Sequence, residues 1–142
     1  MKTLLGCMRV FAIVFAFTSG SLAMNAVWAV EGRFTYRELR VGTGVAAETG
    51  KIALIHFTGW IDNNGIKGKK FFDSRRQGKP VAFKIGTDGV IAGWNIGVVG
   101  MQAGGRRILM IPSELAYGDR GAAGLVPPNA DLIYVIELIE VR

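Results

Sequence analysis

The chain has 142 residues, which corresponds to a single domain of ordinary size. Half of the residues are hydrophobic and only four are proline, so the composition excludes a disordered or collagen-like protein. The formal charge is +6, and it falls to +4 if Lys2 and Arg9 are lost with an N-terminal segment. This mild basic balance is spread along the chain and forms no basic groove, so no nucleic-acid partner is expected.

The beginning of the chain has the pattern of a secretory signal peptide. Two cationic residues precede a short apolar stretch, 10–17, which polar residues then dilute, whereas a spanning helix needs about 20 apolar residues. Small residues place the cleavage site after Ala29 or, as a second choice, after Ala23. The chain is therefore divided into a signal peptide, 1–29, and a domain, 30–142. A periplasmic or secreted protein is expected, and an uncleaved segment would instead anchor it in the membrane.

Short segments of β-branched and aromatic residues follow, and most of them alternate between apolar and polar positions. They predict strands in chain order at 34–40, 51–58, 69–74, 80–86, 106–112 and 131–141. Asn64 and Gly65 predict a hairpin turn, because both residues tolerate a positive φ. One short helix is expected over 94–99, between Gly93 and Gly100. The elements indicate an α+β domain in which an antiparallel sheet packs on one helix.

Several features that could suggest other chemistry have simpler explanations. The segment 42–47 matches a dinucleotide-binding pattern, but no helix can develop after it to face a phosphate. His56 is the only histidine, so the sequence offers neither a Cys/His metal set nor a catalytic triad. Lys67, Lys69 and Lys70 are interpreted as the solvated edge of a hairpin rather than an anion site. No metal ion and no cofactor are therefore expected.

Five segments, taken together, resemble the FKBP-type peptidyl-prolyl cis-trans isomerases. In chain order they are IHFTGWI, GKKFFDS, VIAGWNIGVVGMQAGGRR, IPSELAYGDRGAAGLVPPNA and LIYVIEL. The resemblance covers about residues 33–142. It implies a half-open antiparallel sheet of five to six strands wrapped around one short α-helix, with a shallow apolar pocket between them. It also implies a monomer that acts on proline-containing unfolded or partly folded polypeptides and binds macrolide inhibitors such as tacrolimus and rapamycin.

The same resemblance implies a role for individual side chains. Trp94 is similar to the indole at the pocket floor, Asp73 to the acidic residue beside the twisting amide, and Tyr117 to the residue whose hydroxyl bonds the peptide. With Phe72 these are the implied catalytic residues. The implied substrate-binding residues are Phe57, Phe83, Val90, Ile91, Leu125, Val126 and Tyr134. Within this set the Ile91 amide would hold a substrate carbonyl, and the pair at 125–126 would touch the residue before proline.

The chain also departs from the pattern that it resembles. Many relatives have a tyrosine at the position of Phe57, with its hydroxyl bonded to the aspartate, so Asp73 is expected to rely on Arg75 or Arg76 instead. The loop 62–70 is expected to be longer than in the shortest relatives. Two further positions carry smaller side chains than in some relatives, Val81 and Ala122.

Two functions fit these residues. The first is a prolyl isomerase that speeds the folding of exported proteins; the second is a peptide-binding or chaperone module that holds proline segments with little turnover. Rotation about an X–Pro bond needs no covalent step, and an apolar pocket that removes water favours the twisted amide. Residues that correspond to the pocket floor, the pocket rim and the acidic position are all present, and this favours the isomerase over the binding module.

Overall fold

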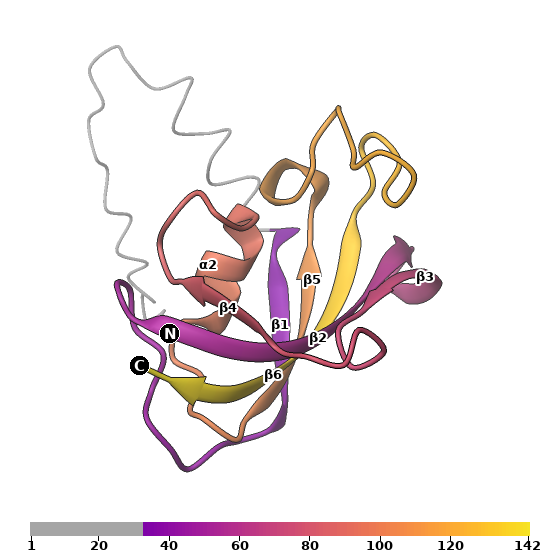
Figure 1. The fold of residues 1–142 in the computed structure, drawn as a ribbon. Coiled ribbons are helices and arrows are strands. Elements are labelled where there is room, and N and C mark those ends of the chain that lie inside the picture. Colours follow the sequence, from indigo (N-terminus) through magenta and orange to yellow (C-terminus); the bar gives the residue numbers. More distant parts are fainter. Residues whose placement is uncertain (1–32) are drawn as a thin grey trace, which may run out of the picture.

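The structure, a computed structural model, describes residues 33–142 (Figure 1). The expected signal peptide and both expected cleavage sites lie outside the described residues. The elements are β1 (Thr35–Arg40), β2 (Ile52–Asn63), β3 (Ile66–Asp73), β4 (Val81–Lys84), α2 (Ala92–Val98), β5 (Arg106–Ile111), η1 (Ser113–Leu115) and β6 (Leu132–Val141). All strand pairs are antiparallel, in the order β1-β5-β6-β2-β3, and β4 also pairs with β2. The α+β prediction is therefore confirmed.

The hairpin between β2 and β3 is more regular than the sequence suggested. Asn64 and Gly65 have φ angles of 52° and 82° at its tip, which confirms the predicted turn. The segment 62–70, expected as a long loop, consists mainly of paired strand that reaches the Asn63–Ile66 pair. Pairing continues because the two turn residues adopt the left-handed conformation that a tight hairpin requires.

Helix α2 packs closely on one face of the sheet (Figure 1). It begins at Ala92, two residues before the predicted start, and its glycines face the sheet. A Cβ atom at Gly93 would lie 2.4 Å from a methyl carbon of Ile111, and one at Gly97 would lie 2.4 Å from a methyl carbon of Leu109. Glycine at these positions therefore brings the helix, and the indole that it carries, down onto β5.

A buried cation holds the C-terminal end of α2. Arg107 on β5 donates from Nη1 to the carbonyl oxygens of Gly97, at 2.7 Å, and Val99, at 3.2 Å. Its Nε donates to a carboxylate oxygen of Glu38 on β1 at 2.8 Å, and its guanidinium lies 4.3 Å from the ring centre of Tyr36. Arg107 therefore neutralises Glu38 and satisfies carbonyl groups at the negative end of the helix dipole.

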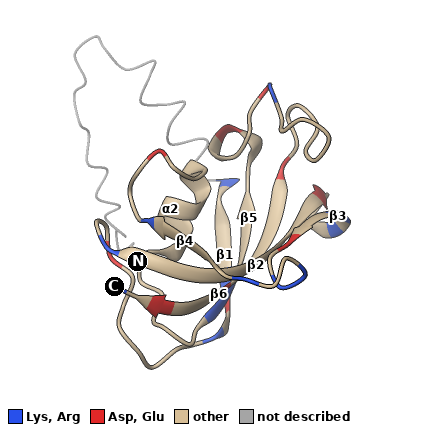
Figure 2. Ribbon diagram, viewed as in Figure 1, with Lys and Arg blue, Asp and Glu red and all other residues tan. Residues whose placement is uncertain are grey.

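The other face of the sheet carries a smaller apolar cluster of Ile108, Ile133 and Val135, with Trp60 and Met110 packed against it. Basic and acidic residues are distributed over several strands and loops, with both signs interspersed (Figure 2). Within residues 33–142, no helix is long and apolar enough to cross a membrane. In the part of the chain that the structure describes, the large core and a cavity lined by aromatic rings both lie on the face that α2 covers.

Candidate active site

An apolar cavity of about 200 Å³ lies where α2 meets β2, β3, β6 and the segment after η1. Most of the side chains around it are aromatic. Its lining consists of Phe57, Phe71, Phe72, Trp94, Tyr117, Ala122, Leu125, Val126 and Tyr134. A small concave apolar site with few polar groups is typical of a pocket that takes a compact apolar group.

Aromatic rings surround Trp94 and fix its orientation. Phe57 meets it edge to face at 4.5 Å between ring centroids, Tyr134 does so at 5.3 Å, and Phe83 tilts against it at 5.7 Å. Phe57 in turn stacks on Phe72, with centroids 4.8 Å apart and an angle of 8° between the rings. These geometries are the favourable ones for ring pairs, so Trp94 is a rigid platform.

The indole nitrogen of Trp94 is buried without a hydrogen-bond partner within residues 33–142. Among the side chains that the structure describes, its Nε1 is the one buried nitrogen or oxygen without a hydrogen-bond partner. A buried donor without a partner is unfavourable for folding, and such groups are rare in native proteins.

A β-bulge brings two consecutive phenylalanines into the cavity. Gly59 pairs with Phe72 and Trp60 pairs with Lys70, so Phe71 is an extra residue between the two pairs. Strict alternation would send neighbouring side chains to opposite faces, but a bulge re-aims one of them. Phe71 was not among the residues predicted for the site, because the sequence does not show where the pairing register between β2 and β3 shifts.

Gly59 makes the room that Phe71 needs. A Cβ atom at this position would lie 2.6 Å from Cζ of Phe71 and 2.8 Å from Cε1 of Tyr134. The two rings meet edge to face with centroids 5.8 Å apart. Any larger residue at position 59 would therefore displace one wall of the cavity.

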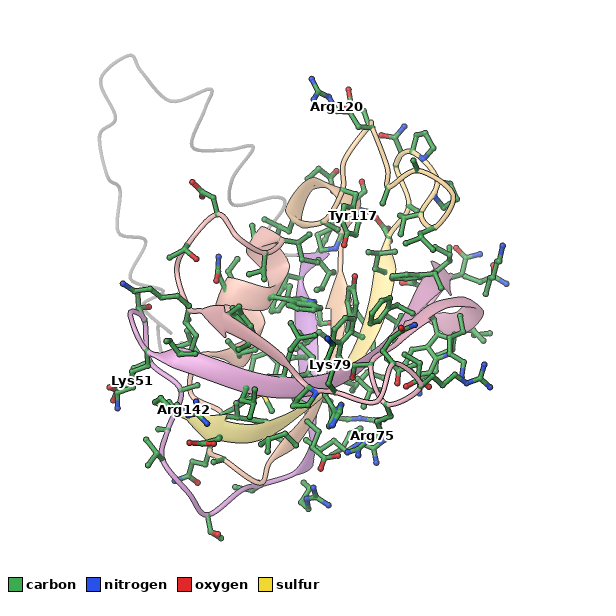
Figure 3. The ribbon with its side chains drawn as sticks, viewed as in Figure 1. Lys51, Arg75, Lys79, Tyr117, Arg120 and Arg142 are labelled. Carbon is green, nitrogen blue, oxygen red and sulfur yellow. The ribbon has the colours of Figure 1, made fainter. Side chains whose placement is uncertain are left out.

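Two tyrosines supply the phenol groups at the cavity. Tyr134 is buried, and this burial, followed by the neighbouring Tyr117, raises the pKa of its phenol well above the ordinary value. A raised pKa keeps the proton on Tyr134 throughout the neutral range. Tyr117 lies at the mouth of the cavity, in the segment after η1, and is partly exposed (Figure 3). Tyr134 therefore remains a neutral phenol that can donate a hydrogen bond at neutral pH.

Asp73 does not line the cavity, although the resemblance implied a place beside the reacting amide. It pairs with Thr58 in the ladder, so the pleat directs its side chain away from the face of Phe57. Its carboxylate accepts a hydrogen bond from the backbone N–H of Arg75 at 3.1 Å and lies 3.5 Å from Nζ of Lys70. Arg75 thus supports Asp73 through its backbone N–H, whereas its guanidinium donates to Glu137 at 2.7 Å. Within residues 33–142 the cation paired with Asp73 is Lys70, and Arg76 forms no ion pair with it.

Three other expected residues lie next to the cavity rather than in its lining. Phe83 contacts Trp94 from β4 and supports the floor. Val90 and Ile91 line a neighbouring cavity of about 490 Å³, which shares Tyr117 with the aromatic one. Ile91 precedes α2, and within residues 33–142 its N–H donates to no other group. The structure thus places a free amide donor between the two cavities.

We expect Phe57→Tyr and Asp73→Ala to have nearly additive effects on the prolyl isomerisation that the resemblance implies. The Asp73 carboxylate already has two partners and points away from Phe57, so a new phenol gains no charged acceptor. Measuring turnover for the parent, both single variants and the double variant tests this expectation. Side chains that do not touch should show a coupling below about 0.5 kcal/mol. A coupling well above that value would show that positions 57 and 73 are in contact.

The fold and the aromatic cavity match a known family. The family model described as FKBP-type peptidyl-prolyl cis-trans isomerase matches residues 44–139, so the chain belongs to this family. Among curated proteins, the chain is 43% identical over 110 residues to the FK506-binding protein of Neisseria meningitidis serogroup A, covering 78% of this chain and 97% of that protein. It is also 43% identical over 98 residues to the peptidyl-prolyl cis-trans isomerase FPR2 of Saccharomyces cerevisiae, covering 69% of this chain and 70% of that protein.

Solved structures give the same result. The crystal structure of AtFKBP13 superposes with a TM-score of 0.69 and 38% identity, covering 77% of this chain and 93% of that one. FkpA from Escherichia coli gives a TM-score of 0.68 and 32% identity, covering 84% of this chain and 60% of that one. The protein is a peptidyl-prolyl cis-trans isomerase, and the predicted family and enzyme class are confirmed.

Proposed function

We propose that this isomerase binds the proline ring on Trp94, inside the aromatic cavity, and there stabilises the twisted X–Pro amide. The observation that carries this proposal is a rigid aromatic lining around a cavity of about 200 Å³, in which the buried phenol of Tyr134 is neutral. Within residues 33–142, no group of three or more His, Cys, Asp or Glu could hold a metal ion. We assign the chemistry to desolvation and hydrogen bonding by the residues that line the cavity.

An apolar site is suited to this reaction. The planar amide has a strongly polar carbonyl, and twisting it breaks the resonance that creates a barrier of about 18–20 kcal/mol. The twisted amide is less polar at oxygen, so removal of water disfavours it less than the planar form. If turnover is about 10² per second, an acceleration of about 10⁴-fold requires about 5.5 kcal/mol of differential stabilisation. Desolvation together with one or two hydrogen bonds can supply this amount.

The roles of the surrounding groups follow from their places. The free N–H of Ile91 would hold the carbonyl that follows proline, and the Tyr117 hydroxyl would donate to a second carbonyl. Leu125 and Val126 would contact the residue before proline from the far wall of the cavity. Asp73 would act as a positioning residue, because its contact with Lys70 spans the bulge that carries the two phenylalanines.

We propose proline-containing unfolded or partly folded polypeptides as substrates and FK506-type macrolides as competing ligands, since the relative from Neisseria is named for FK506. The test is an isomerisation assay of the purified protein on a Leu-Pro peptide, with increasing FK506. Competitive inhibition is expected if proline and FK506 share the cavity. Binding of FK506 without inhibition would contradict the assignment of the cavity as the active site.

We further propose that the protein acts as a monomer on exported polypeptides after signal cleavage. Mass spectrometry of the exported protein should then give the mass of a chain that begins at Val30, or at Met24 for the second cleavage site. The support is the pattern of small residues after a short apolar stretch. An intact Met1 in the membrane fraction would instead establish an uncleaved anchor.

A further inference from the structure

The three lysines of β3 do not share one environment. Lys67 lies 4.2 Å from the ring centre of Trp60, and Lys70 lies 3.5 Å from the carboxylate of Asp73. Both contacts are on the face of the sheet that α2 does not cover, because Lys70 pairs with Trp60 and the Trp60 ring belongs to that face. Lys69 lies between them at a second register shift of the β2–β3 ladder, where strict alternation is interrupted. It lines a cavity together with Ile61, which packs against the core on the face that α2 covers.

On that face Lys69 borders a second cavity, of about 370 Å³, between β3 and the loop after Tyr117. Most of its lining is apolar or small. The lining consists of Ile61, Lys69, Arg120, Ala122, Ala123, Gly124, Leu125, Val126, Pro127 and Pro128. It contains two cations and no acidic residue, and neither cation forms an ion pair within residues 33–142.

The two cations occupy different places in this cavity. Figure 3 shows Arg120 at the outer tip of its loop, with its guanidinium extended toward solvent. Lys69 stands on the opposite wall, on the strand that continues into Phe71 and Phe72. Lys69 is therefore the cation on the rigid wall, and Arg120 adds positive charge at the rim.

This second cavity adjoins the aromatic one. Ala122, Leu125 and Val126 line both cavities, so the segment 122–126 forms their common border. With proline on Trp94 and the preceding residue against Leu125 and Val126, the chain upstream of proline leads into the cavity that Lys69 borders. A carboxylate there would meet an unpaired ammonium group beside apolar walls.

We propose that Lys69 is a specificity-determining residue that favours an acidic side chain at one of the two positions before proline. The inference rests on the proposed function, since it requires proline to bind on Trp94. An ion pair at a partly exposed site changes binding by about two- to fivefold. The preference falls as salt is added, because ions screen the pair.

The experiment compares kcat/KM of the purified protein for two pairs of peptides. One pair is acetyl-Ala-Glu-Leu-Pro-Phe and its Gln analogue, and the other is acetyl-Ala-Ala-Glu-Pro-Phe and its Gln analogue. The Glu peptide of at least one pair should be about two- to fivefold better at low salt. Lys69→Gln should remove this preference, whereas Lys67→Gln, with the same loss of charge on the opposite face, should keep it. Lys69→Glu should make the Gln peptide the better substrate.

Two results would overturn the proposal. The first is that the parent protein shows no preference for the Glu peptide in either pair. The second is that Lys67→Gln reduces the preference as much as Lys69→Gln does, because the preference would then come from the overall positive charge of β3 and not from a contact with Lys69. Isomerisation of the Gln peptides separates this inference from the proposed function. If the protein does not isomerise the Gln peptides, the proposal that proline binds on Trp94 is wrong as well. If it does isomerise them, only the proposed role of Lys69 is wrong.

Discussion

Replacing Trp94 by alanine is expected to abolish isomerase activity and to lower the free energy of unfolding by about 3–5 kcal/mol. The ring is buried and meets Phe57, Phe83 and Tyr134 at centroid distances between 4.5 and 5.7 Å. Its removal takes away the platform for proline and leaves a void that these rings cannot fill without moving. Urea unfolding measures the loss of stability, and peptide isomerisation measures the loss of activity.

A matched control is Trp60→Ala on the other face of the sheet. Trp60 packs on the smaller apolar cluster and against Lys67, on the opposite face of the sheet from the aromatic lining, so this variant should lose stability while keeping its activity per folded molecule. Trp94→Phe keeps part of the packing of the indole. If Trp94→Ala does not fold, FK506 binding is measured on Trp94→Phe instead. Tight FK506 binding to a folded Trp94→Ala variant would contradict Trp94 as the floor of the site.

The sequence predicted most of the fold because its signals are local. Alternating segments marked the strands, and Asn64 with Gly65 marked the hairpin, since both effects depend on neighbouring residues alone. The family motifs also placed Trp94 and Tyr134 correctly in one cavity. Each of these features requires no knowledge of how distant strands align.

The remaining features depend on register, which the sequence does not reveal. A one-residue slip in β3 brings Phe71 into the cavity, and the pairing of Asp73 with Thr58 keeps its carboxylate out. The same reasoning applies to the lysines of β3, which the sequence presents as one solvated group. In the structure Lys67 and Lys70 lie on the face of Trp60, and of the three lysines only Lys69 lines the cavity between β3 and the loop after Tyr117.

The burial of Arg107 is another feature that the sequence does not reveal. Two consecutive arginines at the start of a strand give no sign that one of them is buried. Arg106 pairs with Glu137 and remains exposed, whereas Arg107 points under the end of α2. Arg107→Leu should lower the free energy of unfolding by about 3–5 kcal/mol, since it leaves Glu38 without its partner and two helix carbonyls unsatisfied. Arg106→Leu, the matched control, should cost less than about 1 kcal/mol.

The double variant Arg107→Leu with Glu38→Leu separates the two contributions to that loss. Replacing both members of an ion pair by apolar residues is often neutral, so the part of the loss that comes from an unpaired Glu38 should be recovered. The carbonyl groups of Gly97 and Val99 still lack a donor in the double variant, so recovery should be incomplete. Urea unfolding of all four proteins gives both values. Full recovery would mean that the helix carbonyls do not need Arg107, and that its burial serves only to neutralise Glu38.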